Sequence, residues 1–366
     1  MTPEFWKDKR VFITGHTGFK GAWLTLWLQS LGAKVTGYAL PPPTQPSLFT
    51  LTRLQPHIQH IENDIRDLPQ LTSAMQAAQP GIVLHLAAQS LVRESYQSPV
   101  ETYATNVMGT VHVLEALRHT PSVKAAIMVS SDKCYENKEQ IWGYRETNSM
   151  GGDDPYSNSK GCAELVTHAY RTSFMHDVHS PAIASARAGN VIGGGDWAKD
   201  RLIPDIIQSL INQTHVKLRY PNAIRPWQHV LEPLAGYLQL AECLFNAGTN
   251  YAEGWNFGPN DEDAISVEQM TRALFQAWGV PINFTVENAH LHEAGVLKLD
   301  CTKARSRLNW KPQWNAQTAI QQVSNWYKAY LAGNDMYAYT LDQISQYQQT
   351  LTEKQSAATS FISTSR

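Results

Sequence analysis

A tyrosine and a lysine stand four positions apart in the segment YSNSK, at Tyr156 and Lys160. On a helix this spacing places both side chains on the same face. A lysine ammonium beside a phenol stabilises the phenolate, and so lowers the tyrosine pKa from its ordinary value of about 10. Such a tyrosine can take the proton of an alcohol while a hydride leaves the same carbon. The pair alone is a short motif that also arises by chance.

Three further reactive side chains follow a predicted strand at residues 125–130. They are the hydroxyl of Ser131, the carboxyl of Asp132 and the amine of Lys133. Ligands of parallel sheets bind at the carboxyl ends of the strands, so we expect this segment to lie beside the tyrosine and the lysine. The candidate catalytic residues are therefore Ser131, Asp132, Lys133, Tyr156 and Lys160.

A glycine-rich segment with the spacing GxxGxxG joins the first predicted strand to the first predicted helix. Glycines permit a tight turn and a close approach of the backbone, and the N-terminus of the helix offers free N–H groups to a pyrophosphate. A plain glycine turn is the alternative, but the position between strand and helix favours a dinucleotide loop. The predicted cofactor-binding residues of this loop are Gly15, His16, Thr17, Gly18, Phe19, Lys20 and Gly21.

The remainder of the cofactor site has a weaker signal. An acid that binds the adenine ribose often ends the second strand, but residues 37–40 contain neither an acid nor an arginine, so the loop does not distinguish NAD from NADP. The segment after the third strand could flank the adenine or form a simple turn. Alanines that end the fourth strand would let a cofactor approach, although a buried strand also favours alanine. These further candidates are Asp64, Ile65, Leu86, Ala87 and Ala88.

Short apolar runs alternate with amphipathic segments over the first two-thirds of the chain. This alternation predicts an α/β fold, a Rossmann-type doubly wound parallel sheet with helices on both faces. Pro41, Pro42 and Pro43 end the second strand. The expected strands are 10–15, 34–40, 58–61, 82–87, 125–130 and 183–186, and the expected helices include 19–31, 100–118 and 156–174.

The pattern changes after about residue 190, where a glycine-rich turn is followed by shorter elements with scattered Pro and Trp. We therefore expect a Rossmann domain at 1–190 that carries Ser131, Tyr156 and Lys160. A smaller α/β C-terminal domain at 191–350 would mainly bind the substrate, with possible insertions into the first. The Ser/Thr-rich segment 351–366 is expected to be a flexible tail.

The composition excludes several classes of protein. Charged residues are 17% of the chain and the net charge is −2, which argues against a nucleic-acid binder. The four cysteines form no CxxC pair, so we expect neither a metal site nor a disulfide framework, and a reducing cytoplasm fits best. The first residues lack the pattern of a signal peptide, and no apolar window approaches the ~18 residues that a transmembrane helix needs.

The glycine loop, the strand-end serine and the YxxxK motif together resemble the extended short-chain dehydrogenase/reductase family. Within this family, the chain is similar to the sugar-nucleotide 4,6-dehydratases that act on CDP-glucose, from about residue 5 to 330. Long unbroken matches of this kind are more specific than short motifs. The similar stretches are GHTGFKGAWL, SDKCYENKEQIWGYRE, DPYSNSKGCAEL, RAGNVIGGGDWAKDRLIPD, IRPWQHVLEP and EGWNFGP.

The resemblance implies NAD as cofactor, CDP-glucose as substrate and an internal redox cycle. Tyr156 would deprotonate the glucose 4-hydroxyl as hydride moves from C4 to NAD, and Ser131 would bind the 4-oxygen. A base would then remove the C5 proton, Asp132 would protonate the departing 6-hydroxyl, and hydride would return to C6. Lys160 would also reach the nicotinamide ribose.

The base is the point at which this sequence departs from its relatives. Many dehydratases carry Thr-Asp-Glu at the strand end, whereas this chain has Ser-Asp-Lys, with Lys133 in place of the glutamate. A lysine acts as a base only when it is neutral. Lys133 either transfers the proton itself or pairs with Asp132 or Glu136 and only positions the substrate.

The resemblance also implies the residues that hold the substrate. Asn190 and Arg225 match residues that contact the diphosphate, and a guanidinium suits phosphate because it offers a fork of donors. Relatives often place a second arginine near the segment around His292 and Glu293, where this chain has none, so Arg201 or Lys298 could compensate. Asn106, which we count with the cofactor-binding residues, matches an asparagine that supports the active-site lysine. The full substrate set is Gln89, Asn190, Arg201, Leu202 and Arg225.

Two other functions compete with this one. A 4-epimerase or reductase of the same fold needs the tyrosine and lysine but no acid–base pair for loss of water, so Asp132 and Lys133 favour a dehydratase. A non-catalytic dinucleotide-binding protein would not need Tyr156 and Lys160. By resemblance, the product would supply deoxysugars for the O-antigen of bacterial lipopolysaccharide. We expect a homodimer or higher homo-oligomer, formed through the helices 100–118 and 156–174 unless these face the sheet.

Overall fold

The computed structural model describes residues 2–177, 179–287 and 295–363. His292 and Glu293 therefore lie outside the described residues. The central sheet contains β1 (Arg10–Thr14), β2 (Lys34–Ala39), β3 (Gln59–Glu62), β4 (Ile82–His85), β5 (Ala125–Val129), β6 (Ala182–Ala188) and β11 (Gly254–Phe257). These seven strands are all parallel, in the order β11-β6-β5-β4-β1-β2-β3. The predicted doubly wound sheet is confirmed.

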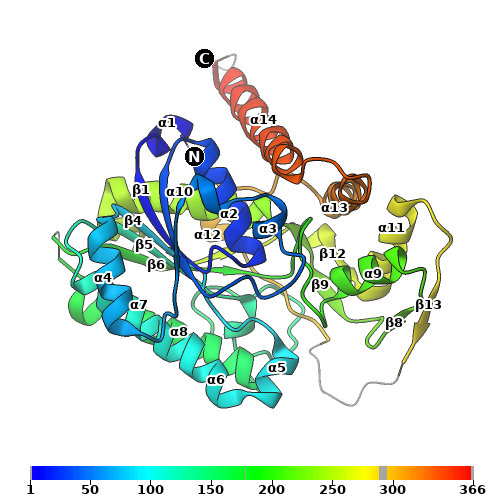
Figure 1. The fold of residues 1–366 in the computed structure, drawn as a ribbon, viewed down its shortest axis with the longest axis horizontal. Helices are drawn as coiled ribbons and strands as arrows, with labels where there is room; N and C mark the ends of the chain where they lie inside the picture. Colours follow the sequence, from blue (N-terminus) through cyan, green and yellow to red (C-terminus); the bar gives the residue numbers. More distant parts are fainter. Residues whose placement is uncertain (1, 178, 288–294, 364–366) are drawn as a thin grey trace.

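Helices cover both faces of the sheet because successive side chains of a buried strand point to opposite sides. In β1, Val11 and Ile13 belong to one apolar core and Phe12 to the other. The first core is completed by α2 (Phe19–Ser30) and α10 (Leu231–Ala247), the second by α4 (Leu68–Ala78) and α7 (Gly109–Arg118). The long helix α8 (Pro155–Phe174) lies beside α7 (Figure 1).

The expected helix at 100–118 is divided into three segments. These are α6 (Pro99–Tyr103), the π-helical turn η2 (Ala104–Met108) and α7. Such widened turns occur often at functional sites. The buried Asn106 lies in the middle of η2, and its side chain bonds outside the helix.

A smaller lobe lies at the right of Figure 1. Its helices are α9 (Leu202–Ile211) and α11 (Val267–Trp278). Its strand pairs are β8 (Val216–Leu218) with β13 (Phe284–Val286), and β9 (Ile224–Pro226) with β12 (Ala264–Ser266). Between these segments the chain returns to the main sheet, where β11 pairs with β6. The chain thus crosses between the two lobes more than once.

The chain ends with α13 (Ala316–Leu331) and α14 (Met336–Ser363), which takes in part of the segment predicted to be a tail. The phenol of Tyr347 on α14 donates to Glu232 on α10, at 2.7 Å. Among the described helices, none combines the length and apolar character that a membrane crossing requires. The remaining elements are α1 (Pro3–Trp6), α3 (Leu48–Leu51), α5 (Val92–Gln97), α12 (Thr302–Arg307), β7 (Val191–Ile192), β10 (Gln228–His229), η1 (Gln55–His57), η3 (Asp132–Cys134), η4 (Gly248–Tyr251) and η5 (Asp261–Asp263).

Candidate active site

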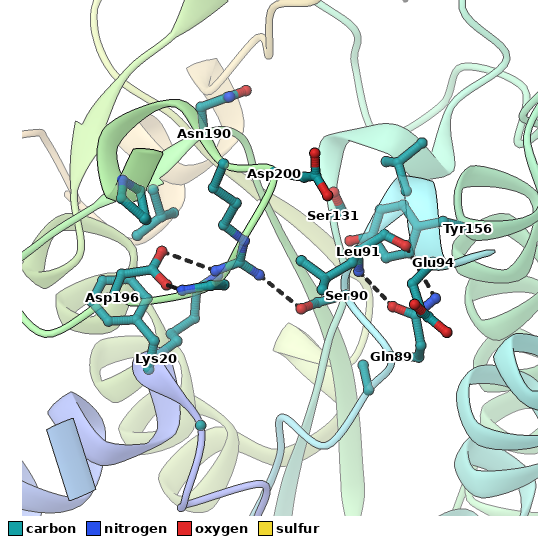
Figure 2. Close-up of a pocket in the computed structure, with 18 of the residues that line it drawn as sticks. Lys20, Gln89, Ser90, Leu91, Glu94, Ser131, Tyr156, Asn190, Asp196 and Asp200 are labelled. Carbon is teal, nitrogen blue, oxygen red and sulfur yellow. Dashed lines mark hydrogen bonds and ion pairs between the residues drawn. The ribbon is translucent and has the colours of Figure 1, made fainter. Parts of the chain in front are cut away.

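A cavity of about 1340 Å³ opens at the carboxyl ends of the sheet strands, and residues of the smaller lobe form its other wall (Figure 2). This is where open parallel sheets bind ligands. The cavity brings together all five candidate catalytic residues and most of the predicted binding residues. Those on its wall are Gly15, Thr17, Gly18, Phe19, Lys20, Gly21, Asp64, Ile65, Leu86, Ala87, Ala88, Gln89, Ser131, Asp132, Lys133, Tyr156, Lys160, Asn190, Arg201, Leu202 and Arg225.

The glycine loop has the geometry that a pyrophosphate needs. Gly15 has φ +77°, and a Cβ there would lie 2.6 Å from the backbone nitrogen of Ala87. A Cβ on Gly21 would lie 2.1 Å from the carbonyl oxygen of Gly15. Gly18 begins α2 without a side-chain cap, so the first N–H groups of this helix remain available on the cavity wall. The loop therefore fits a dinucleotide cofactor.

His16, which was predicted with this loop, has its side chain beneath the loop and is not on the cavity wall. Its Nε2 lies 2.7 Å from Nδ1 of His60, and its ring packs against Gly37 and the edge of Phe49. Burial, assisted by the charge of His60, lowers the pKa of His16 to about 3. The ring is therefore neutral at physiological pH and supports the loop from below.

Asn106 also lies behind the cavity. Its amide nitrogen donates to the carbonyl of Gln89 and to the hydroxyl of Ser159, both at 2.9 Å, and its oxygen accepts the N–H of Gln89 at 2.8 Å. These bonds join the π-helical turn, the segment after β4 and the helix that carries Tyr156 and Lys160. Asn106 thus holds three parts of the site together without touching the cavity.

Ser131 and Asp132 begin the short turn η3 directly after β5. The hydroxyl of Ser131 donates to Oδ1 of Asp132 at 2.9 Å and accepts the N–H of Lys133 at 3.3 Å. Asp132 is only 3% exposed, and within the described residues its Oδ2 has no hydrogen-bond partner. Burial raises the pKa of Asp132, opposed by the charges of Lys133 and Arg225 and by the Ser131 hydrogen bond. A buried carboxyl with an unused oxygen is suited to hold and donate a proton.

Tyr156 and Lys160 lie on the first turns of α8, which begins at an Asp154 cap that accepts the N–H of Ser157. Both are buried, at 8% and 7% exposure. Burial raises the pKa of Tyr156 to about 12, although a hydrogen bond with Ser131 and the charge of Arg201 act in the opposite direction. The sequence led us to expect a lowered phenol pKa, and this expectation neglected the cost of burying a phenolate.

Burial also lowers the pKa of Lys160, to about 8, and Glu164 one helical turn later opposes this shift. Glu164 is itself buried against Arg187 of β6, with Nε–Oε1 and Nη2–Oε2 distances of 2.8 Å. The i, i+4 spacing from Lys160 to Glu164 could have revealed this counter-charge in the sequence. Glu164 thus keeps a negative charge close to the buried Lys160.

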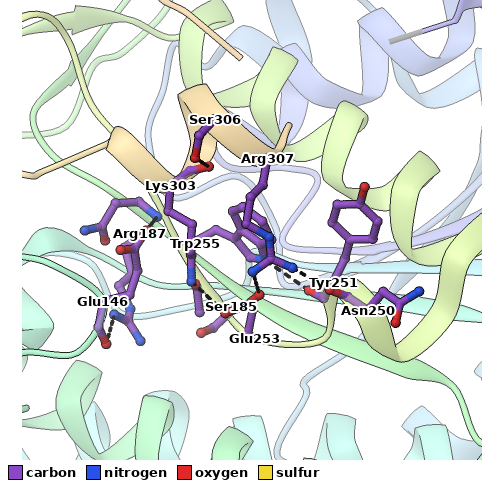
Figure 3. A network of polar contacts seen from close by, with 12 residues as sticks. Glu146, Ser185, Arg187, Asn250, Tyr251, Glu253, Trp255, Lys303, Ser306 and Arg307 are labelled. Atoms are coloured by element: carbon purple, nitrogen blue, oxygen red, sulfur yellow. Dashed lines mark hydrogen bonds and ion pairs between the residues drawn. The ribbon is translucent and has the colours of Figure 1, made fainter. Parts of the chain in front are cut away.

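Arg187 continues into a polar network at the edge of the sheet, shown in Figure 3. Its Nη1 donates to the phenol of Tyr135, directly after η3, at 2.6 Å. Glu253, directly before the neighbouring strand β11, accepts from Lys303 of α12 at 2.9 Å and also binds Arg307, while both cations lie over the Trp255 ring. These contacts anchor the outer strand behind the catalytic helix.

Lys20 adds another positive charge to the cavity from the glycine loop. Its pKa is lowered to about 7, first by desolvation and then by the charges of Lys160 and Arg201. Its ammonium lies 5.8 Å from the centre of the Tyr237 ring. The sequence placed Lys20 in the glycine loop, but it did not predict that the charges of Lys160 and Arg201 would act on it.

Lys133 is half-buried on the cavity wall. Glu136, one of its two expected partners, pairs instead with Lys138 at 3.2 Å. Over the described part of the chain, no carboxylate forms an ion pair with Lys133. Its charge nevertheless favours the ionised form of Asp132. The structure therefore leaves the Lys133 amine available to a ligand in the cavity.

Of the predicted substrate residues, Arg201, Leu202 and Arg225 belong to the smaller lobe, which forms the other wall of the cavity. Gln89 and Asn190 follow strands β4 and β6 of the main sheet. Arg201 donates to Asp196 at 3.0 Å and to the hydroxyl of Ser90 at 2.7 Å (Figure 2). Arg225 on β9 is 7% exposed and donates to the carbonyl of Ile224 at 3.0 Å. Neither Asp196 nor Ser90 was predicted as a partner of Arg201, although only Ser90, 111 positions away, is remote from it in the sequence.

A second charged group on the same wall was also missed, and it comprises Arg93, Asp200, Asp205 and Arg219. Asp200 accepts from Arg93 at 3.3 Å and from Arg219 at 3.1 Å. In the sequence these residues are spread over 127 positions, from 93 to 219. No local motif could therefore have identified them as one group.

Comparisons with known proteins agree with this geometry. A model of the GDP-mannose 4,6 dehydratase family matches residues 12–323. The CDP-glucose 4,6-dehydratase of Salmonella typhimurium (strain LT2) is 52% identical over 354 residues, which are 95% of this chain and 99% of that protein. The dTDP-glucose 4,6-dehydratase of Streptomyces venezuelae, solved with NAD, has a TM-score of 0.77 at 20% identity, covering 90% of this chain and 99% of that one. A UDP-glucose 4-epimerase of Stenotrophomonas maltophila with bound NAD has a TM-score of 0.78 at 21% identity, over 89% and 99%.

Proposed function

Because the chain belongs to the GDP-mannose 4,6 dehydratase family, we propose that it converts CDP-D-glucose to CDP-4-dehydro-6-deoxy-D-glucose with NAD as cofactor. The enzyme is a hydro-lyase that removes water across C5 and C6 of the sugar. The observation that carries this proposal is that Asp132, with a buried oxygen that no described residue hydrogen-bonds, lines the same cavity as Tyr156, Lys160 and the glycine loop. The relative that is 52% identical supports the choice of CDP-glucose.

The glycine loop and the N-terminus of α2 would hold the pyrophosphate of NAD, and Asp64 and Ile65 would flank its adenosine. When bound, NAD supplies a hydride acceptor for C4, a hydride donor for C6 and a positive charge in the cavity. Ala87 and Ala88 leave room for it at the end of β4. Lys160 would bind the nicotinamide ribose and, while protonated, stabilise the phenolate of Tyr156.

Each proton in the reaction has a proposed carrier. Tyr156 takes the proton from the 4-hydroxyl, and Ser131 holds the resulting oxygen by a hydrogen bond. The 4-keto group makes the C5 proton acidic, and Lys133, in its neutral form, removes it. Asp132, whose raised pKa favours the protonated form, donates to the departing 6-hydroxyl so that it leaves as water.

We predict that Lys133→Met lowers the formation of the 4-keto-6-deoxy product by a factor of roughly 10²–10⁴, the usual contribution of a general base. In D₂O the variant would also fail to exchange hydrogen at C5. Lys133→Arg is the matched control, because it keeps the positive charge but cannot act as a neutral base. A Lys133→Met enzyme with the full rate of dehydration would remove the proposed role, and rescue by arginine would reduce it to positioning.

Arg225 and Asn190 would hold the diphosphate of the substrate, with Arg201 as a second guanidinium. In the structure Arg201 is already bound to Asp196 and Ser90. These bonds keep its fork of donors on the cavity wall, next to the catalytic phenol on which its charge acts. Gln89 and Leu202 would complete the substrate site.

The competing functions have less support. A 4-epimerase of this fold has no use for the Asp132 carboxyl and the Lys133 amine, which both line the cavity. A non-catalytic dinucleotide-binding protein would not need Tyr156 and Lys160, which are both buried on that wall. The dehydratase accounts for all five residues.

The test is an assay of the purified protein with CDP-glucose, with and without added NAD, that follows the alkaline absorbance of a 4-keto sugar. UDP-, dTDP- and GDP-glucose are run in parallel. The proposal predicts product from CDP-glucose in clear preference to the others. Absence of product from every nucleotide sugar would contradict the dehydratase and restore the epimerase or reductase.

We further propose that the protein works in the cytoplasm as a homodimer or higher homo-oligomer. Its four free thiols suit a reducing compartment. Large apolar side chains are exposed on α6, η2 and α8, which supports pairing through these helices. The exposed residues are Val100, Met108, Leu165 and Phe174. Its product would supply deoxysugars for the O-antigen of lipopolysaccharide.

A further inference from the structure

The charged residues on the cavity wall form two separate groups. Arg201 and Arg225 act on the catalytic groups, since their charges lower the pKa of Tyr156 and of Asp132 respectively. The second group, which we call the outer cluster, consists of Arg93, Asp200, Asp205 and Arg219. None of its members is among the principal charges that act on Tyr156 or Asp132.

The outer cluster lies where the nucleoside of a nucleotide sugar has to go, if the proposed function holds. The glucose has to reach Tyr156, and the diphosphate follows it to Arg225 and Arg201. The nucleoside then continues along the cavity, away from the catalytic residues. The wall that remains there is formed by the first turns of α9, which carry Asp205, and by the segment from β8 to Arg219.

Asp205 is an unusual residue for a cavity that takes an anionic diphosphate. The other acids of this wall are paired, Asp196 with Arg201 and Asp200 with Arg93 and Arg219. Among the described residues, Asp205 has no ion pair and receives only a hydrogen bond from the backbone N–H of Asp200. Its pKa is raised to about 6, by desolvation first and by the charge of Asp200 second. This carboxylate has acceptor capacity left for a ligand.

Arg219 has unused donors next to this acceptor. One of its terminal nitrogens binds Asp200 at 3.1 Å, and its charge acts on Asp205. A guanidinium carries five N–H donors in a fixed fork, so several remain for another partner. The outer cluster thus presents an acceptor and a set of donors side by side.

We propose that Asp205 and Arg219 recognise the nucleobase and select cytosine. Cytosine presents an amino donor at C4 beside the acceptors N3 and O2, which a carboxylate and a guanidinium complement, and acidic side chains recognise this amino group in nucleic acids. Uracil and thymine present an acceptor at C4 and a donor at N3. The same two side chains would therefore oppose them at both positions, with unpaired polar groups left buried.

The test compares CDP-glucose with UDP-glucose in Asp205→Asn and Arg219→Gln enzymes. Asp205→Asn should lower the ratio of kcat/KM for CDP-glucose to that for UDP-glucose by about 10- to 100-fold, because the asparagine amide can donate an N–H to the uracil O4, which a carboxylate cannot. Arg219→Gln should shift the same ratio in the same direction. If Arg219 held the diphosphate instead, its loss would weaken both substrates equally and leave the ratio unchanged.

Affinities for CDP and UDP, measured by calorimetry on the same proteins, keep the inference testable if no turnover is found. A wild type that prefers CDP but forms no 4-keto sugar would contradict the proposed function and leave the base site standing. A wild-type preference that persists unchanged in Asp205→Asn would overturn the base site alone. Asp342→Asn on α14 is the matched control, since this exposed carboxylate accepts a hydrogen bond from Gln346 of its own helix and should leave the ratio unaltered.

Discussion

Replacement of Tyr156 by phenylalanine is expected to lower kcat for formation of the 4-keto-6-deoxy product by a factor of roughly 10²–10⁴. The change removes one oxygen atom from a residue that is 8% exposed and otherwise keeps its shape. Without the phenol, no group at this position can take the 4-hydroxyl proton as hydride leaves C4. The first chemical step therefore fails, and every later step depends on it.

Substrate binding separates this role from a structural one. The Tyr156→Phe protein should bind CDP-glucose with nearly unchanged affinity and melt at nearly the wild-type temperature. Ser131, which hydrogen-bonds with the phenol, keeps its bonds to Asp132 and to the N–H of Lys133 in this variant. In D₂O, C5 of the recovered substrate should carry no deuterium, because exchange at C5 requires the 4-keto group. A Tyr156→Phe enzyme that still exchanged C5 at the wild-type rate would show that another group takes the 4-hydroxyl proton.

Replacement of Asp132 by asparagine is expected to reduce dehydration by a similar factor, roughly 10²–10⁴, but at a later step. Asparagine keeps the size of the side chain and can still accept the Ser131 hydroxyl hydrogen bond. It has no proton to donate to the departing 6-hydroxyl at neutral pH. Oxidation at C4 and removal of the C5 proton should continue, so glucose recovered from D₂O should carry deuterium at C5 while little water is lost.

The pH dependence offers a second check on Asp132. Burial raises its pKa, so the protonated form that donates to the leaving group is present at low pH and is lost as the pH rises through this raised value. The wild-type dehydration step should therefore decline toward high pH in a way that Asp132→Asn does not. Asp154→Asn, at the cap of α8, is the matched control for loss of a nearby carboxylate. Equal dehydration rates in the wild type and in Asp132→Asn would assign the acid to another residue.

Much of the fold could be predicted because the signals were local. Apolar runs of strand length, amphipathic helices and the glycine loop identified the parallel sheet, and six of its strands were expected close to where they lie. β11 could not be assigned in the same way, because it pairs with β6 across more than 60 positions of sequence, which include α9 of the smaller lobe and α10 of the main one. The π-helical turn around Asn106 was hidden within an otherwise regular helical pattern.

The same distinction between local signals and long-range contacts applies to the candidate site. The catalytic residues could be proposed because Ser131–Lys133 and Tyr156–Lys160 are short segments at the ends of predictable elements. The pKa values of these residues could not be predicted, because they depend on burial and on charges of the other lobe, such as that of Arg201. The outer cluster around Asp205 was equally inaccessible, because only the folded chain brings its members to one wall.

The most direct test of the central claim follows one hydrogen atom through the reaction. CDP-glucose with deuterium at C4 would be converted by the wild-type enzyme with NAD, and the product would be analysed by NMR and mass spectrometry. The internal redox cycle predicts a 4-keto-6-deoxy sugar with deuterium on C6. Deuterium that returned to C4 with inversion would identify an epimerase, and a 6-deoxy product without deuterium at C6 would contradict the internal return of the hydride.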